Sequence, residues 1–130
     1  MRIFIVDDSE LIRDRLKERL TAIENVQIVG QAEDAYSAVT MIAQAHPDVV
    51  ILDVRMPGGS GIDVLRAIKK EGSPPQIIML TKYPYPQYRE KCLELGADYF
   101  FDKATEFDNT IELIRKLSQE HSQNQESPKV

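Results

Sequence analysis

Three short, unbroken apolar runs most constrain how this chain can fold. They are IFIV at 3–6, VVIL at 49–52 and IIML at 77–80. Strands buried on both faces of a parallel sheet have continuous runs of this kind, whereas half-buried strands alternate with polar residues. The three runs therefore predict the central strands of a parallel sheet that is covered by helices on both faces.

Two further apolar segments are interrupted or bounded by polar residues. VQIVGQ at 26–31 contains two glutamines, and DYFFD at 98–102 is short and has an acid at each end. Such mixed segments are typical of edge strands. Placing them outside the three central strands gives the order 2-1-3-4-5, which defines an α/β, doubly wound, flavodoxin-like fold.

Segments with helical spacing of apolar residues separate the strands. These positions are Ile12, Leu16, Leu20 and Ile23; Ala38, Met41, Ile42 and Ala45; Leu65 and Ile68; Tyr88, Cys92 and Leu95; and Phe107, Ile111, Ile114 and Leu117. Five helices thus alternate with five strands. Right-handed crossovers place the first and fifth helices on one face and the other three on the opposite face.

The length of 130 residues suits one hydrophobic core and leaves little room for a second. We expect one domain over residues 1–118. The polar sequence at 119–130 predicts a disordered tail. Because the chain starts at Met1 and ends in a short polar tail, we expect a domain that stands alone; the alternative is a domain excised from a longer protein.

Charge and composition exclude several classes of function. The net charge is −5 and no cluster of lysine and arginine stands out, which argues against direct nucleic-acid binding. No apolar stretch has the length of a membrane span or of a signal peptide, so we expect a cytoplasmic location without membrane insertion. The single cysteine, Cys92, excludes an internal disulfide, and two histidines are too few for a zinc site.

Polar residues follow four of the predicted strands at the point where each strand ends. Asp7 and Asp8 follow the first strand, Asp53 the third, Thr81 the fourth and Lys103 the fifth. Each residue alone has an ordinary explanation as a cap, a turn former or a solvated charge. The carboxyl ends of parallel strands share one edge, where ligands of such sheets bind. Together, the five residues predict a binding site at that edge.

The residue types at this edge indicate phosphoryl chemistry. Two unit charges about 4 Å apart repel by roughly 4 kcal/mol at an effective dielectric of 20, so three carboxylates need a cation or protons. Oxygen ligands without histidine or thiolate favour a hard ion such as Mg²⁺. With the Lys103 ammonium, the Thr81 hydroxyl and the glycine-bearing loop after Asp53, the site suits a phosphoryl group. A carboxylate can also act as the nucleophile in phosphoryl transfer.

The motifs around these residues resemble the receiver domain of bacterial two-component response regulators. They are IVDDSE, VVILDVRMPGGSG, IIMLT and GADYFFDKA, in the family's order and spacing from about Arg2 to Leu117. The resemblance implies a phosphorylation-activated signalling switch rather than an enzyme that acts on other substrates. A sensor histidine kinase or phosphotransfer protein would supply the phosphoryl group, and the partner-binding surface would then change.

The resemblance also implies individual roles. Asp53 matches the phosphoacceptor, and Thr81 and Lys103 match the residues that contact the phosphoryl group. Phe100 matches the aromatic residue that turns inward when the switch threonine moves. The implied ligands of Mg²⁺ are Asp7, Asp8, Asp53 and the backbone carbonyl of Arg55.

Several residues depart from the family pattern. Ala104 follows Lys103, where receivers commonly have a proline after a cis bond; Lys82 follows Thr81, where a small residue is usual. Pro84 and Pro86 predict a stiff loop, and Pro86 is placed to start the fourth helix. The aromatic residues near the fourth helix and fifth strand predict either core packing or a partner surface. They are Tyr83, Tyr85, Tyr88, Tyr99 and Phe100. The resemblance implies a possible homodimer, or contact with an unknown downstream protein, through the fourth helix, fifth strand and fifth helix.

The sequence leaves three alternatives to the switch. A phosphohydrolase or phosphotransferase with an aspartyl intermediate would share the carboxylate and Mg²⁺, but position 55 is an arginine rather than a second acid. A receiver-like scaffold that never signals by phosphorylation is the second alternative. A flavodoxin or dinucleotide binder is less favoured, because no G-x-G-x-x-G follows the first strand.

Overall fold

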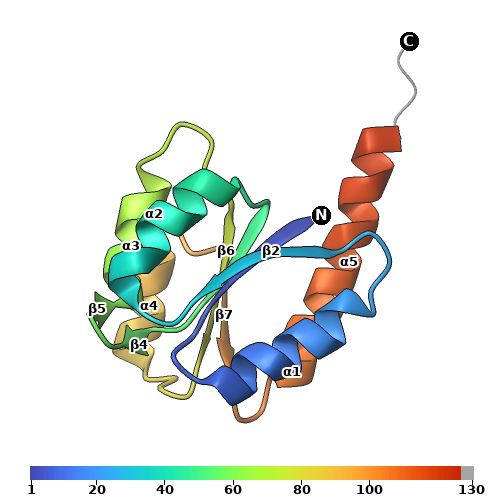
Figure 1. Ribbon diagram of the computed structural model, residues 1–130. Coiled ribbons are helices and arrows are strands. Elements are labelled where there is room, and N and C mark those ends of the chain that lie inside the picture. The colour runs from blue at the N-terminus through green and yellow to red at the C-terminus, as the bar shows by residue number, and fades with distance from the viewer. Residues whose placement is uncertain (127–130) are drawn as a thin grey trace.

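The computed structural model, described for residues 1–126, has a five-stranded parallel sheet between two layers of helices (Figure 1). The strands of this sheet are β1 (Arg2–Val6), β2 (Gln27–Ala32), β3 (Val49–Leu52), β6 (Gln76–Thr81) and β7 (Tyr99–Asp102). Their order is β2-β1-β3-β6-β7, and all neighbours are parallel. Counting only these five strands, this is the predicted order 2-1-3-4-5, so the predicted fold class is confirmed.

Helices cover both faces of the sheet as the crossover rule predicts. They are α1 (Glu10–Thr21), α2 (Ala35–Ala45), α3 (Gly61–Lys69), α4 (Pro86–Glu94) and α5 (Phe107–Glu126). Figure 1 shows α1 and α5 on one side of the sheet and α2, α3 and α4 on the other. Pro86 occupies the first turn of α4, where its missing N–H costs nothing.

Each layer of helices has its own hydrophobic core. Ile3, Ile5 and Ile51 pack against α1 and α5, whereas Phe4 and Leu52 pack in the core of α2, α3 and α4. Alternate residues of β1 and β3 thus enter opposite cores, which is why these strands are apolar at every position. The edge strands β2 and β7 are less buried, as their mixed sequences indicate.

The glycine-bearing loop after Asp53 contains a small ladder that the sequence pattern did not predict. β4 (Arg55–Met56) pairs antiparallel with β5 (Gly59–Ser60). Gly58 and Gly59 have φ angles of 75° and 128°, a region that favours glycine. This short hairpin leads directly into α3.

The predicted disordered tail is wrong for residues 119–126, which continue α5 beyond the rest of the molecule (Figure 1). Ser118 is buried and its hydroxyl donates to the Glu24 carbonyl at 3.0 Å, while His121 Nε2 lies 3.9 Å from Asp48 Oδ2. Glutamine and glutamate are good helix formers, so polarity signals exposure here and not a lack of helix. Residues 127–130 lie outside the described part of the chain.

Candidate functional site

The carboxyl ends of β1 and β3 bring the three predicted acids together. The register pairs Val6 with Leu52, and the Asp53 amide donates to the Val6 carbonyl at 3.0 Å. Asp7, Asp8 and Asp53 each offer a carboxylate oxygen, and these oxygens lie within 4.8 Å of one another. Asp7 and Asp53 are buried, whereas Asp8 is exposed to solvent.

Lys103 joins this cluster from the end of β7. Its Nζ lies 2.6 Å from Asp7 Oδ2 and 3.0 Å from Asp53 Oδ2, with only a tenth of its side chain exposed. Its backbone amide donates to the Thr81 carbonyl at 2.8 Å, which fixes the start of the side chain at the sheet edge. One buried ammonium therefore connects the ends of β1, β3 and β7. The contact with Asp7 is additional to the role that the resemblance gives to Lys103.

Burial and charge act in opposite directions on the pKa values of Asp7 and Lys103. Burial raises the pKa of Asp7 above its ordinary value, and the hydrogen bond and charge of Lys103 only partly counter that effect. Burial alone would lower the pKa of Lys103, but the charge of Asp53 and the contacts with Asp7 outweigh burial, so the pKa is raised. Lys103 is thus charged at neutral pH.

Asp53 has one carboxylate oxygen without a protein partner. Its Oδ2 accepts from Lys103, whereas its Oδ1 is buried and accepts no hydrogen bond within the described chain. An unpaired buried carboxylate oxygen is costly, so it marks a position for a cation or an incoming donor. A set of carboxylate oxygens, one of them unpartnered and one open to solvent, fits Mg²⁺.

Thr81 ends β6 at the same edge and is fully buried. Its hydroxyl oxygen accepts a hydrogen bond from the Tyr83 amide at 3.0 Å, so it is engaged with the loop that follows. No hydrogen bond joins Thr81 to Asp53 among the residues that the structure describes. The structure therefore brings Thr81 to the site edge with its hydroxyl bound to its own loop.

Phe100, the predicted switch aromatic, lies inward. Its side chain is 6% exposed and belongs to the core under α2, α3 and α4. Arg89 of α4 contacts it in two ways: its Nη1 donates to the Phe100 carbonyl at 3.3 Å, and its guanidinium lies 5.8 Å from the ring centroid. The spacing of residues gave no signal for this arginine.

The remaining predicted positions are placed as follows. Arg55 lies in β4, and its exposed side chain packs over the Tyr83 ring, which the sequence did not indicate. The peptide bond between Lys103 and Ala104 is trans, as are all other bonds in the described residues. Cys92 is buried in the core, as predicted, and burial raises the pKa of its thiol to about 11.

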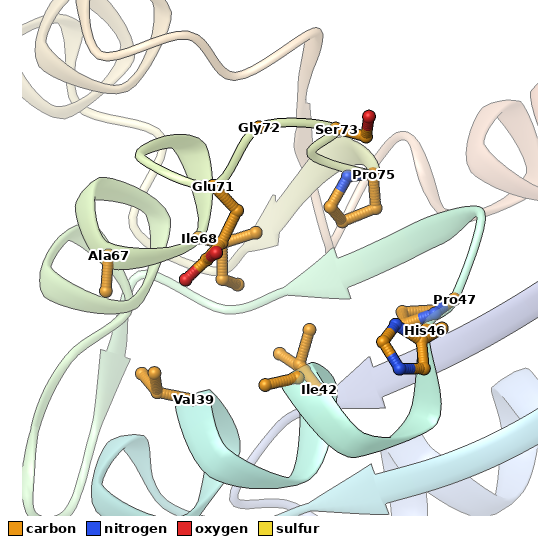
Figure 2. Close-up of a pocket in the computed structure, with 11 residues that line it drawn as sticks. Val39, Ile42, His46, Pro47, Ala67, Ile68, Glu71, Gly72, Ser73 and Pro75 are labelled. Atoms are coloured by element: carbon orange, nitrogen blue, oxygen red, sulfur yellow. The ribbon is translucent and has the colours of Figure 1, made fainter.

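A groove lies near the C-terminal ends of α2 and α3. This groove of about 420 Å³ has apolar walls that include Val39, Ile42 and Ile68 (Figure 2). Glu71 and His46 stand at its rim as the titratable groups among its described lining residues. Its described lining residues include no cluster of acids comparable to the one at the edge with Asp53.

The fold and this edge define a class of protein: a doubly wound α/β domain in which three carboxylates, a buried lysine and a strand-terminal threonine meet at the carboxyl edge of a parallel sheet. The sequence model of the response regulator receiver domain matches residues 3–115. The chain therefore belongs to the response regulator receiver domain family.

Individual relatives agree with this assignment. The transcriptional regulatory protein YvfU of Bacillus subtilis, described as uncharacterized, is 33% identical over 116 residues, which are 89% of this chain and 58% of that protein. The response regulator domain of CheB from Thermotoga maritima superposes with a TM-score of 0.81 at 27% identity, covering 92% of this chain and 94% of that one.

A third similar protein was solved as the CheX–CheY–BeF₃–Mg²⁺ complex from Borrelia burgdorferi. The match has a TM-score of 0.75 at 28% identity and covers 87% of this chain and 88% of that one. The chain spans about half the length of the first curated relatives, for example 57% and 48% of two of them. No helix in the described residues is long and apolar enough to cross a bilayer.

Proposed function

We propose that this chain is a phosphorylation-activated switch of a two-component system, in which Asp53 accepts a phosphoryl group from a sensor histidine kinase or phosphotransfer protein. The observation that most supports this role is the state of the Asp53 carboxylate. One oxygen is held by Lys103 and the other is buried and unpartnered beside two further acids. Membership of the receiver family supports the same assignment.

In the proposed reaction Asp53 Oδ1 attacks the phosphorus in line. The phosphorus–nitrogen bond to the donor histidine breaks, and its electron pair returns to the imidazole. The carboxylates of Asp7, Asp8 and Asp53 and the carbonyl of Arg55 would hold Mg²⁺, which supplies charge neutralisation. The Lys103 ammonium and the Thr81 hydroxyl contact the phosphoryl oxygens of the product.

The contacts of the Lys103 ammonium must change when Asp53 is phosphorylated. In the structure its ammonium is bound to Asp7 and Asp53. A dianionic group on Asp53 offers stronger acceptor oxygens than one carboxylate does. We propose that Lys103 then moves one of its contacts to that group, while Thr81 gives up its hydrogen bond with the loop.

We place the partner surface on α4, β7 and α5. Tyr85 and Leu93 are exposed large apolar residues in the loop before α4 and on α4, a composition that suits a protein interface. The proposed partners are a second copy of the chain or a downstream protein, with no direct nucleic-acid contact, in the cytoplasm. Sedimentation of the protein with and without a stable phosphoryl mimic distinguishes the homodimer from a change that needs another partner.

Incubation with a small-molecule phosphodonor and Mg²⁺ tests the acceptor. We expect the parent protein to take up acid-labile, hydroxylamine-sensitive phosphate and Asp53→Asn to take up none. Asp63→Asn, which changes an exposed acid on α3, is the matched control and should be labelled like the parent. Equal labelling of Asp53→Asn and the parent would show that Asp53 is not the acceptor.

A further inference from the structure

A contact between two loops connects the acceptor loop to the loop that follows Thr81. The Arg55 guanidinium carbon lies 4.6 Å from the centroid of the Tyr83 ring, within the range of a cation–π interaction. Arg55 is two residues beyond Asp53, and Tyr83 is two residues beyond Thr81. We call this pair of side chains the loop clamp.

The loop clamp acts on a residue that already holds Thr81. The Tyr83 amide donates to the Thr81 hydroxyl oxygen at 3.0 Å. A ring fixed over Arg55 therefore also fixes the amide that binds the hydroxyl. The contacts run without a break from the strand end at Asp53, through Arg55 and Tyr83, to the strand end at Thr81.

Tyrosine rings extend the same contacts toward α4. The ring centroids of Tyr83 and Tyr85 are 6.3 Å apart, and those of Tyr85 and Tyr88 are 5.8 Å apart. Tyr88 packs against the core under α4. In the segment where tyrosine alternates with Pro84 and Pro86, one ring thus lies over Arg55 and the next ones lie along the start of the helix.

We infer that Arg55 and Tyr83 are positioning residues that hold Thr81 in its resting arrangement and so oppose the switch. This inference rests on the proposed function, since it concerns the same threonine. The phosphorylated state needs the Thr81 hydroxyl at the phosphoryl group, and every contact that favours the loop-bound hydroxyl shifts the two-state equilibrium away from that state. Breaking the loop clamp therefore favours the activated arrangement.

The expected size of the effect follows from the exposure of the pair. A cation–π contact at an exposed site corresponds to about a two- to fivefold change in an equilibrium constant. Lys82 Nζ is also near the Tyr83 ring, but at 5.7 Å from the centroid, so its share should be smaller. Breaking the loop clamp is thus expected to shift the equilibrium between the resting and activated arrangements without abolishing switching.

The first test needs no phosphodonor. Hydrogen exchange at the amide of position 83 reports its bond to Thr81, because every substitution except proline keeps the N–H. We expect Tyr83→Leu to speed this exchange about two- to fivefold after correction for intrinsic rates, and Tyr83→Phe, which keeps the ring, to leave it near the parent value. Equal exchange in the Leu and Phe variants would overturn the inference.

The second test measures the affinity for beryllofluoride with Mg²⁺, a phosphoryl mimic. We expect Tyr83→Leu to bind it about two- to fivefold more tightly than the parent or Tyr83→Phe. Arg55→Gln also removes a positive charge near an anion site, so it is compared in the parent and in the Tyr83→Leu background. The loss of positive charge affects the affinity equally in both backgrounds. The difference between the two affinity changes therefore measures the contact between Arg55 and Tyr83.

Two results contradict the inference: Tyr83→Leu binding the mimic no more tightly than Tyr83→Phe, or Arg55→Gln changing affinity equally in both backgrounds. Arg66→Gln, which removes an exposed arginine of α3, controls for net charge. If the parent neither binds the mimic nor takes up phosphate on Asp53, the proposed function fails, while the exchange measurement still decides whether the loop clamp exists.

Discussion

Gly61, the first residue of α3, lies in backbone contact with Asp53. A β-carbon at Gly61 would stand 1.8 Å from the Asp53 carbonyl oxygen, and the Gly61 amide donates to the neighbouring Val54 carbonyl at 2.7 Å. The start of α3 therefore packs directly against the backbone of Asp53. Any other side chain at position 61 displaces backbone and not merely a flexible group.

We predict that Gly61→Ala destabilises the protein and displaces Asp53. The loss of unfolding free energy should reach the upper end of the range for overpacking, about 1–3 kcal/mol, and Mg²⁺ affinity should fall with it. Urea unfolding and Mg²⁺ titration measure the two effects. Gly72→Ala is the matched control, because a β-carbon there meets nothing within 4 Å, and a similar loss in both variants would refute the role of the close contact.

Lys103→Met should destabilise the metal-free protein more than a surface lysine change does. It leaves the buried carboxylates of Asp7 and Asp53 without their ammonium partner. Removing one member of a buried ion pair costs about 3–5 kcal/mol. Urea unfolding in chelator should show this loss, and Mg²⁺ should recover part of it. Lys116→Met, at an exposed position of α5, provides the comparison; an equal loss in both variants would contradict the prediction.

The raised pKa of Asp7 predicts how Mg²⁺ binding depends on pH. Because burial lifts this pKa above 3.8, the folded protein binds the proton more readily than the unfolded chain does. The contribution of Asp7 to stability is thus present at low pH and is lost as pH rises from 3.8 through the folded-state pKa. Protonated Asp7 cannot serve as a metal ligand.

Mg²⁺ affinity should therefore weaken as the pH falls, beginning above the range of an ordinary aspartate. Titrations with Mg²⁺ at a series of pH values measure this dependence. Asp7→Asn should bind Mg²⁺ more weakly and show a flatter profile over the same interval. A parent profile that begins to fall only near pH 3.8 would show that burial does not raise this pKa.

The extension of α5 should contribute little to stability. The side chains at 119–123 are half-buried or exposed, and one of their contacts with the domain is the pair of His121 and Asp48, with 3.9 Å between Nε2 and Oδ2. Partly exposed contacts of this kind contribute about 0–1 kcal/mol each, so ending the chain after Ser118 should cost little, on the order of 1 kcal/mol. Ser118→Ala removes a buried hydrogen bond to Glu24 and should cost about as much by itself. If truncation lowers the free energy of unfolding by several kcal/mol, the domain extends beyond residue 118.

The sequence was sufficient to locate the strand ends and hence the edge at which their polar residues meet. Strands that are buried on both faces have unbroken apolar runs, so the polar residue after each run marks the sheet edge. That reasoning correctly brought Asp7, Asp8 and Asp53 together. It also brought Lys103 to the two buried acids among them.

The sequence did not reveal contacts that depend on where long side chains bend. Arg55 reaches the Tyr83 ring and Arg89 reaches Phe100, and neither spacing nor composition distinguishes these arginines from solvated ones. The length of α5 was missed for a different reason. Polarity reports burial, whereas helix formation at residues 119–126 depends on backbone propensity, which glutamine and glutamate favour.

The position of Lys103 at the end of an edge strand has one more consequence. β7 is paired on one side only, with β6, and Lys103 fastens its end to the interior through Asp7 and Asp53. A divalent ion held by the same acids would compete with that ammonium for their oxygens. Ion binding and the local opening of β7 would then be thermodynamically linked, so a change of charge at the acids would change the hydrogen-exchange protection of the backbone amides of β7.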